Sequence, residues 1–313
     1  MPLDLKNDLP LVAMPGMLLL VELIALFLSR PLQAAGVEAL PYSPENPLNV
    51  VVFLVLLLVF TLFILALIRF GVKFLLSAII GLSLFFTFYY IFGALALILT
   101  GENEIAGLAT LLLAAGATML LYKYPEWYVL DTLGILICAG VASIFGIAVG
   151  ILPALLLLVL LAVYDAISVY RTKHMITLAE GVLSVKAPIL FVIPKRRDYS
   201  FIKEGITIGG EGGGEVKEGE RKERGAFIIG MGDLIMPTIL VVSAYVFLPV
   251  EGWAVPPPAL GAVIGSLAGL SLLLRAVKRG KPQAGLPPLN GGTIAGFLIG
   301  CALSGAWGWI PGI

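Results

Sequence analysis

The sequence predicts an all-α polytopic membrane protein with nine transmembrane helices. Hydrophobic residues make up 59% of the 313, and only 13% are charged, against roughly 25% in soluble domains. The mean hydropathy is +1.04. The apolar residues also gather in runs of about 20, the length at which a helix crosses a bilayer.

Charges, prolines and glycines separate the runs from one another. The nine predicted spans are residues 10–29, 48–68, 74–99, 105–122, 128–149, 152–170, 226–248, 259–277 and 286–308. Only residues 150–153 separate the fifth run from the sixth, but together they are too long for one helix, and Pro153 marks a break. No small-residue cleavage pattern follows the first run, so we expect an uncleaved helix rather than a signal peptide.

The positions of Lys and Arg predict an orientation. With nine spans, nineteen of the 20 basic residues fall on one side of the membrane, and Arg30 alone on the other. Without the eleven in the 171–225 loop the ratio is still eight to one. Because basic loops remain in the cytoplasm, we expect the N terminus and the 171–225 loop to be cytoplasmic and the C terminus external.

The long loop divides the chain into three predicted parts. Residues 1–170 form a six-helix part, 171–225 a partly disordered cytoplasmic loop, and 226–313 a three-helix part. Within the loop, the β-branched segment 186–194 predicts a short strand or an interfacial segment, and 205–210 is able to pair with 189–193 as the second strand of a β-hairpin. The following residues are rich in Gly, Glu and Lys, a composition typical of a flexible linker.

Two aspartates, Asp165 and Asp233, interrupt the sixth and seventh runs. A charge at membrane depth costs several kcal/mol, roughly 3 on insertion scales, so both suggest a working site. Measured at helical rise from Arg171 and Arg224, they lie ~9 and ~13 Å from one surface, which allows them to face each other. Such a pair shares one proton. One carboxylate can then deprotonate a water while the other, as an acid, protonates a scissile carbonyl.

The residues around Asp233 indicate a functional site rather than a carboxylate that faces lipid by chance. Gly230 and Gly232 flank Met231 and would let another backbone approach closely. Pro237 donates no hydrogen bond, so the carbonyl of Asp233 loses its helical partner. Irregular backbone of this kind is tolerated at membrane depth where it lines a cavity.

Other chemistries find less support in the sequence. The same aspartates could serve an ion-leak channel or a proton-coupled transporter, although a transporter would show related halves, and none is apparent. His174 is the one histidine and lies at the membrane surface, which excludes an H-E-x-x-H zinc site. We expect no metal and no cofactor. Glu22 is a third carboxylate in an apolar run, near the surface or paired.

The motifs Tyr164-Asp165 and Gly230-Met231-Gly232-Asp233 resemble the YD and GxGD motifs of the presenilin and signal peptide peptidase family. The stretches YDAISVYRTKHMITLAE and GMGDLIMPTIL extend the resemblance over about 160–240. It implies a prokaryotic-type intramembrane aspartyl protease with Asp165 and Asp233 as the catalytic dyad. Tyr164, Gly230, Met231, Gly232 and Pro237 would support the active site. A prepilin-type GxGD peptidase is a third interpretation, but it would lack the YD context.

The family's third motif, PAL, occurs literally at 258–260, where it opens the eighth span on the wrong side of the membrane. QAGLP at the start of the ninth span instead resembles the family pattern Q-P-A-L-P, and a shifted register would use 287–289. The PAL-like substrate-binding residues are therefore Ala284, Gly285, Leu286, Pro287, Pro288 and Leu289.

The resemblance also implies the partners of the chain. The substrates would be single-pass transmembrane proteins within the lipid bilayer, with no role for nucleic acid, and the oligomeric state stays open. The predicted cytoplasmic loop is similar to the presenilin orientation and favours type I-like substrates. Because a helix must unwind before its peptide bonds are accessible, we hypothesise that segment 189–193, with 206–208, pairs with the unwound substrate by β-augmentation.

Overall fold

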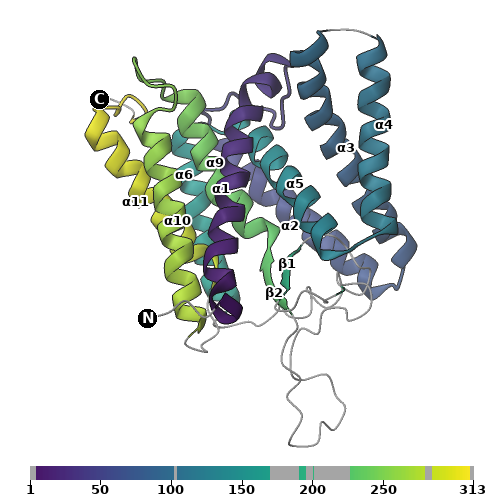
Figure 1. Ribbon diagram of the computed structural model, residues 1–313. Coiled ribbons are helices and arrows are strands. Elements are labelled where there is room, and N and C mark those ends of the chain that lie inside the picture. Colours follow the sequence, from purple (N-terminus) through teal and green to yellow (C-terminus); the bar gives the residue numbers. More distant parts are fainter. Residues whose placement is uncertain are drawn as a thin grey trace, which may run out of the picture.

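The computed structural model describes residues 5–101, 104–169, 190–194, 200, 226–278 and 284–310. Within these residues the chain folds into nine helices and one two-stranded sheet (Figure 1). The helices are α1 Leu5–Ala34, α2 Leu48–Arg69, α3 Lys73–Thr100, α4 Glu104–Lys123, α5 Trp127–Ala148, α6 Ile151–Ile167, α9 Met231–Phe247, α10 Pro257–Lys278 and α11 Leu286–Ser304. Each predicted span overlaps one helix, which confirms the fold class.

Seven of the described helices are long and apolar enough to cross a membrane, whereas α6 and α9 have 17 residues each. At 1.5 Å per residue these two measure about 25 Å, less than the roughly 30 Å of a hydrocarbon core. They are also the helices that carry Asp165 and Asp233. The residue before each of these helices, Gly150 or Gly230, is extended, and backbone that leaves helical geometry at or near membrane depth needs other hydrogen-bond partners.

The sheet consists of β1 (Leu190–Pro194) and β2 (Ala226–Gly230), paired antiparallel with Leu190 opposite Gly230 and Val192 opposite Ile228. The predicted strand near 189–193 is confirmed, but its partner is β2, and segment 205–210 lies outside the described residues. In Figure 1 the sheet lies at the lower end of the bundle, where α1 begins and α10 ends. We call this end the sheet end.

The prediction that residues 226–230 are helical is wrong. This apolar, β-branched segment extends to pair with β1, and α9 begins only at Met231, after Gly230 in an extended conformation (φ −68°, ψ 138°). The depth of ~13 Å for Asp233 assumed helical rise over the same residues. An extended chain covers about 3.3 Å per residue rather than 1.5 Å, so that depth estimate is wrong as well.

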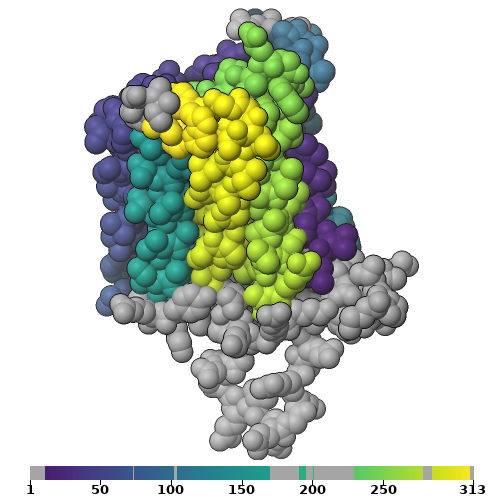
Figure 2. Space-filling view, turned by 90° about the vertical axis from the view of Figure 1, so that its left-hand side faces the viewer, coloured from purple at the N-terminus to yellow at the C-terminus, as the bar shows by residue number. Residues whose placement is uncertain are grey.

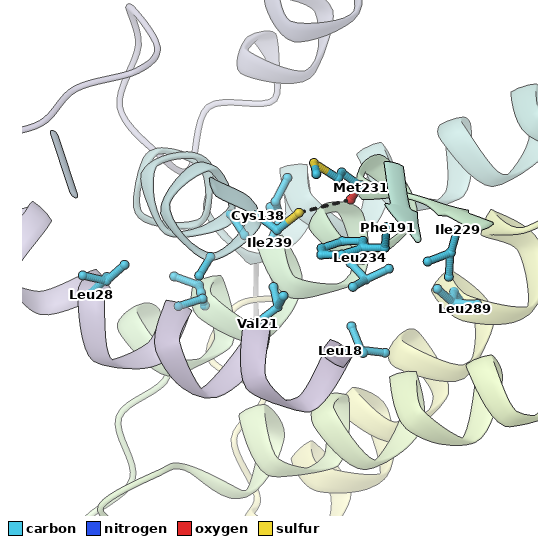
Figure 3. Packing of buried hydrophobic residues seen from close by; sticks show 14 of the residues in the cluster. Leu18, Val21, Leu28, Cys138, Phe191, Ile229, Met231, Leu234, Ile239 and Leu289 are labelled. Carbon is cyan, nitrogen blue, oxygen red and sulfur yellow. Dashed lines mark hydrogen bonds between the residues drawn. The ribbon is translucent and has the colours of Figure 1, made fainter. Parts of the chain in front are cut away.

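The core forms where α1, α5 and α9 meet. Figure 3 shows buried side chains from these helices packed together with residues of both strands. Phe191 of β1 is fully buried in this cluster, beside Leu234 of α9 and Leu18 of α1. The sheet is thus anchored in the same core as the helix that carries Asp233.

Helices α10 and α11 pack with their backbones in direct contact. A Cβ added at Gly265 would lie 2.1 Å from the carbonyl oxygen of Gly292, and one at Gly296 would lie 2.0 Å from that of Gly261. Small residues permit such close approach between membrane helices. In Figure 2, α11 lies on the surface between α10 and α6. The start of α11 is therefore held between these two helices.

The literal PAL sequence at 258–260 lies far from the aspartates, as predicted. A Cβ at Gly300 of α11 would meet the carbonyl oxygen of Pro257 at 2.2 Å, so the start of α10 packs near the end of α11. Gly300 lies fourteen residues after Leu286, or about 21 Å along the helix. The residues nearest the aspartates must come from the other end of α11.

Candidate active site

Asp165 lies two residues before the end of α6, at the sheet end of the bundle. Its side chain is buried, and its Oδ2 accepts a hydrogen bond of 3.0 Å from the backbone N–H of Leu286, the first residue of α11. The helix ends shortly afterwards, where the N–H of Ser168 donates to the carbonyls of Asp165 and Tyr164. Asp165 thus joins the end of α6 to the start of α11.

Asp233 is the third residue of α9 and is half-buried. Its carboxylate accepts a hydrogen bond from the backbone N–H of Gly230, the residue that caps the helix. An acidic side chain at this position commonly reaches back to the capping N–H. The bond fixes the carboxylate at the junction between β2 and α9.

The two carboxylates meet at residues 285 and 286. A Cβ added at Gly285 would lie 3.2 Å from Oδ2 of Asp233, while the next residue, Leu286, donates to Asp165. The two carboxylates also lie close enough to repel one another electrostatically. Asp165 and Asp233, which are 68 positions apart in sequence, therefore share one neighbourhood at the start of α11.

The other PAL-like residues differ in their burial and in their position relative to this contact. Ala284 is buried, and Pro287 and Pro288 form the first turn of α11. Leu289 is fully buried in the core, and a Cβ at Gly269 of α10 would lie 3.1 Å from its Cα. The residues that reach the carboxylates are thus Gly285 and Leu286, and both belong to the QAGLP segment.

The predicted supporting residues occupy different surroundings. The side chain of Tyr164 is 55% exposed, so it is not enclosed between the aspartates. A Cβ at Gly232 would meet nothing within 4 Å, and the nearest atoms to one at Gly230 belong to Asp233 itself. No other backbone of the described residues lies against either glycine, since Gly230 belongs to the strand and Gly232 is exposed, so close approach of another backbone stays a prediction.

Met231 and Pro237 have clear structural roles. Met231 is buried, and its carbonyl oxygen accepts a bond of 3.7 Å from the Sγ of Cys138 (Figure 3). Pro237 is buried inside α9 and leaves the carbonyl of Asp233 without its i+4 donor. The hydroxyl of Thr238 bonds to the carbonyl of Leu234 at 2.7 Å, a contact that often bends helices. The helix is therefore weakened immediately after Asp233.

Three further buried polar residues bond one element of the bundle to another. Asn290 donates to the carbonyl of Leu158 at 2.9 Å and ties α11 to α6 one turn beyond Leu286. Glu22 is fully buried and accepts a bond of 2.6 Å from Ser266 of α10, so it is paired rather than near the surface. Asp131 of α5 accepts a bond of 2.8 Å from the N–H of Val192 in β1.

Sequence reasoning missed Asp131 and Asn290. Both stand inside predicted spans, and a polar side chain at membrane depth is a signal of function or pairing. Asp131 lies near the start of its run, where charged residues commonly mark the boundary of a span. Asn290 carries no charge, so it gives a weaker signal than a carboxylate. The cost of burying either group would have pointed to both.

The nine helices of the described residues bring two carboxylates together at the start of α11, which defines a polytopic membrane protein with a paired-carboxylate centre. The chain matches the family model described as signal-peptide peptidase, presenilin aspartyl protease over residues 15–306. It therefore belongs to this family, is an integral multi-pass membrane protein and is an aspartic endopeptidase of the intramembrane-cleaving class.

Two solved structures are similar to the whole chain. Both are of a presenilin family intramembrane aspartate protease, one in space group C222 and the other in P2. They are 49% and 50% identical to this chain, cover 94% and 95% of it and 99% of their own chains, and each has a TM-score of 0.70. No curated protein sequence matches the chain.

Proposed function

We propose that this protease hydrolyses peptide bonds of transmembrane substrate helices with Asp165 and Asp233 as its catalytic dyad. The observation that carries the proposal is the contact of adjacent residues, Gly285 and Leu286, with the two carboxylates. Such convergence of two acidic side chains at membrane depth is costly. This cost supports a catalytic role for the pair.

The chemistry follows from the proximity of the two like charges. Two carboxylates this close cannot both ionise readily in a low dielectric, so the pair holds one proton. The ionised member removes a proton from a water molecule, which attacks the scissile carbonyl. The protonated member donates its proton to the carbonyl oxygen as the tetrahedral intermediate forms.

The sheet supports a route by which an unwound substrate reaches the dyad. The N–H of Val192 donates to Asp131, so Val192 and Ile228 form a non-hydrogen-bonded pair in the antiparallel ladder. The backbone N–H and C=O of Val192 therefore point away from β2 and toward α5. Those of Ile228 point away from β1, on the opposite edge of the sheet. Among the described residues, the edge without a neighbouring strand is that of β2, which supports substrate pairing there rather than at 189–193 as hypothesised from the sequence.

The direction of β2 supports the same route. Gly230 occupies the same kind of ladder position as Ile228, and its N–H already donates to Asp233. A substrate strand paired with β2 would therefore run toward the carboxylates. Backbone pairing at a free edge holds an extended peptide without demanding a particular sequence.

The distribution of basic residues bears on which substrates enter. With nine spans, nineteen of the 20 Lys and Arg are predicted on the side of the membrane at which the sixth span ends, which supports a cytoplasmic sheet end and an external C terminus. The 171–225 loop then joins a six-helix part, 1–170, to a three-helix part, 226–313, from the cytoplasmic side. Single-pass substrates of type I-like topology are those that this orientation favours.

The proposal is tested with the purified full-length chain in liposomes. A single-pass transmembrane peptide is added in type I-like and reversed orientation, and the products are identified by mass spectrometry while ion flux is recorded. We expect cleavage inside the apolar segment of the type I-like peptide. Ion flux without any cleavage would contradict the proposal and would favour the channel interpretation.

A further inference from the structure

One face of α5 contacts both the sheet and the start of α9. Asp131, Gly134 and Cys138 lie at positions i, i+3 and i+7 of this helix, a spacing that puts them on one side. All three are buried. We call these residues the α5 stripe.

The polar member of the stripe is Asp131. Its side chain is 6% exposed, and its Oδ1 accepts the bond of 2.8 Å from the backbone N–H of Val192. The carboxylate therefore caps the outer edge of β1, where a further strand would otherwise bond. A second hydrogen bond links α5 to a residue that follows β1 in sequence. The hydroxyl of Ser200 donates to Oε1 of Glu126, near the start of α5, at 2.7 Å.

The apolar members of the stripe fit against the residues that flank the carboxylates. A Cβ at Gly134 would lie 3.0 Å from Cε1 of Phe191 and 2.6 Å from the methyl carbon of Met231. Cys138 bonds to the carbonyl of Met231, and Figure 3 shows the two residues beside Phe191. Met231 stands two residues before Asp233, so the stripe contacts β1 and the start of α9 at once.

We propose that Asp131 is a positioning residue for proteolysis. It fixes β1 against α5 through the N–H of Val192, and thereby fixes the height at which β2 presents an extended substrate to Asp165 and Asp233. This inference rests on the proposed function. The acceptor oxygen of Asp131 lies on the side of β1 opposite the edge of β2 at which the substrate would pair.

The test uses variants that separate an effect on the position of the substrate from an effect on the stability of the protein. Asp131→Leu removes the acceptor, Asp131→Asn keeps an acceptor oxygen, and Thr132→Leu alters the exposed neighbouring residue as a matched control. Gly134→Ala adds one methyl group against Phe191 and Met231 without changing any polar group. Each full-length variant is assayed for KM, kcat, the bonds cleaved and the thermal unfolding temperature.

For Asp131→Leu we expect KM to rise about tenfold, the usual scale for one buried hydrogen bond, and cleavage to spread to neighbouring peptide bonds. Asp131→Asn should restore the wild-type cleavage position, and Thr132→Leu should match the wild type. Gly134→Ala should also spread the cleavage positions, which keeps the test decisive if Asp131→Leu fails to fold.

The inference is overturned if Asp131→Leu and Gly134→Ala lower the unfolding temperature but keep the wild-type KM and cleavage position. It is also overturned if Asp131→Leu fails to fold and Gly134→Ala cleaves as the wild type does. A wild-type chain that cleaves no transmembrane peptide would contradict the proposed function itself, so the two failures are distinguishable.

Discussion

The backbone N–H of Leu286 donates a hydrogen bond of 3.0 Å to Oδ2 of Asp165. The first N–H groups of a helix have no partner within it, and the next two residues of α11 are prolines, which have no N–H at all. Leu286 thus supplies the principal donor of this helix start. Asp233 likewise lies in the first turn of α9. Two helix N-termini, which favour negative charge, converge on the carboxylate pair.

Gly285 should tolerate no large side chain. A Cβ there would lie 3.2 Å from Oδ2 of Asp233, so Gly285→Leu must displace that carboxylate. A displacement of about 1 Å can reduce catalysis by about a hundredfold, and we expect a loss of at least that order in the cleavage rate. Gly291→Leu is the matched control, because its Cβ meets nothing within 4 Å. Equal rates for the two variants would contradict the assigned contact.

The two residues at the middle of β2 should respond differently to proline. The N–H of Ile228 faces away from β1, whereas that of Ile229 lies in the ladder opposite Phe191. Ile228→Pro should therefore raise KM for a transmembrane peptide with little change in the unfolding temperature. Ile229→Pro should lower the unfolding temperature, because it removes a ladder hydrogen bond. Unchanged KM for Ile228→Pro would argue against substrate pairing at this edge.

Close packing between α10 and α11 should make Gly265 sensitive to a single methyl group. The Cβ of Gly265→Ala would lie 2.1 Å from the carbonyl oxygen of Gly292, which forces the helices apart. Overpacking of this kind costs about 1–3 kcal/mol, and we expect a lower unfolding temperature. Gly116→Ala, in open space on α4, should be neutral or stabilising. Matching unfolding temperatures for the two variants would refute the direct backbone contact.

Pro237 should reduce stability while supporting activity. Pro237→Ala supplies the N–H that the carbonyl of Asp233 lacks, and an interior proline costs a helix about 3 kcal/mol. We expect a higher unfolding temperature and a lower cleavage rate, because α9 becomes regular at the proposed catalytic residue. Higher stability with an unchanged rate would mean that the loosened helix has no part in the reaction.

Much of the fold follows from hydropathy alone. Each apolar run becomes a helix, because a bilayer requires backbone groups to be satisfied internally. The start of α9 could not be predicted in the same way, since residues 226–230 are apolar enough for either structure and only the presence of β1 makes them a strand. That pairing joins residues 32 or more positions apart in sequence, which no local pattern records.

The candidate site was predictable in part. Asp165 and Asp233 are visible as costly charges in apolar runs, and the motif resemblance identifies both. Their contact with Gly285 and Leu286 depends on how α11 packs between α6 and α10, which the register of glycines on two helices determines. The bond between Asp131 and Val192 joins a side chain to a backbone N–H, and such a bond leaves no pairwise signature in the sequence.

The central claim is that Asp165 and Asp233 both perform the chemistry, and the most direct measurement is the cleavage rate of a transmembrane peptide by Asp165→Asn and Asp233→Asn. Each variant keeps the shape of the side chain but cannot exchange the required proton. We expect each rate to fall by about a thousandfold or more, the scale of acid-base catalysis. Glu22→Gln changes a buried carboxylate that bonds to Ser266 of α10 rather than to the dyad, and it should retain activity. Cleavage at the wild-type rate by either aspartate variant would contradict the account.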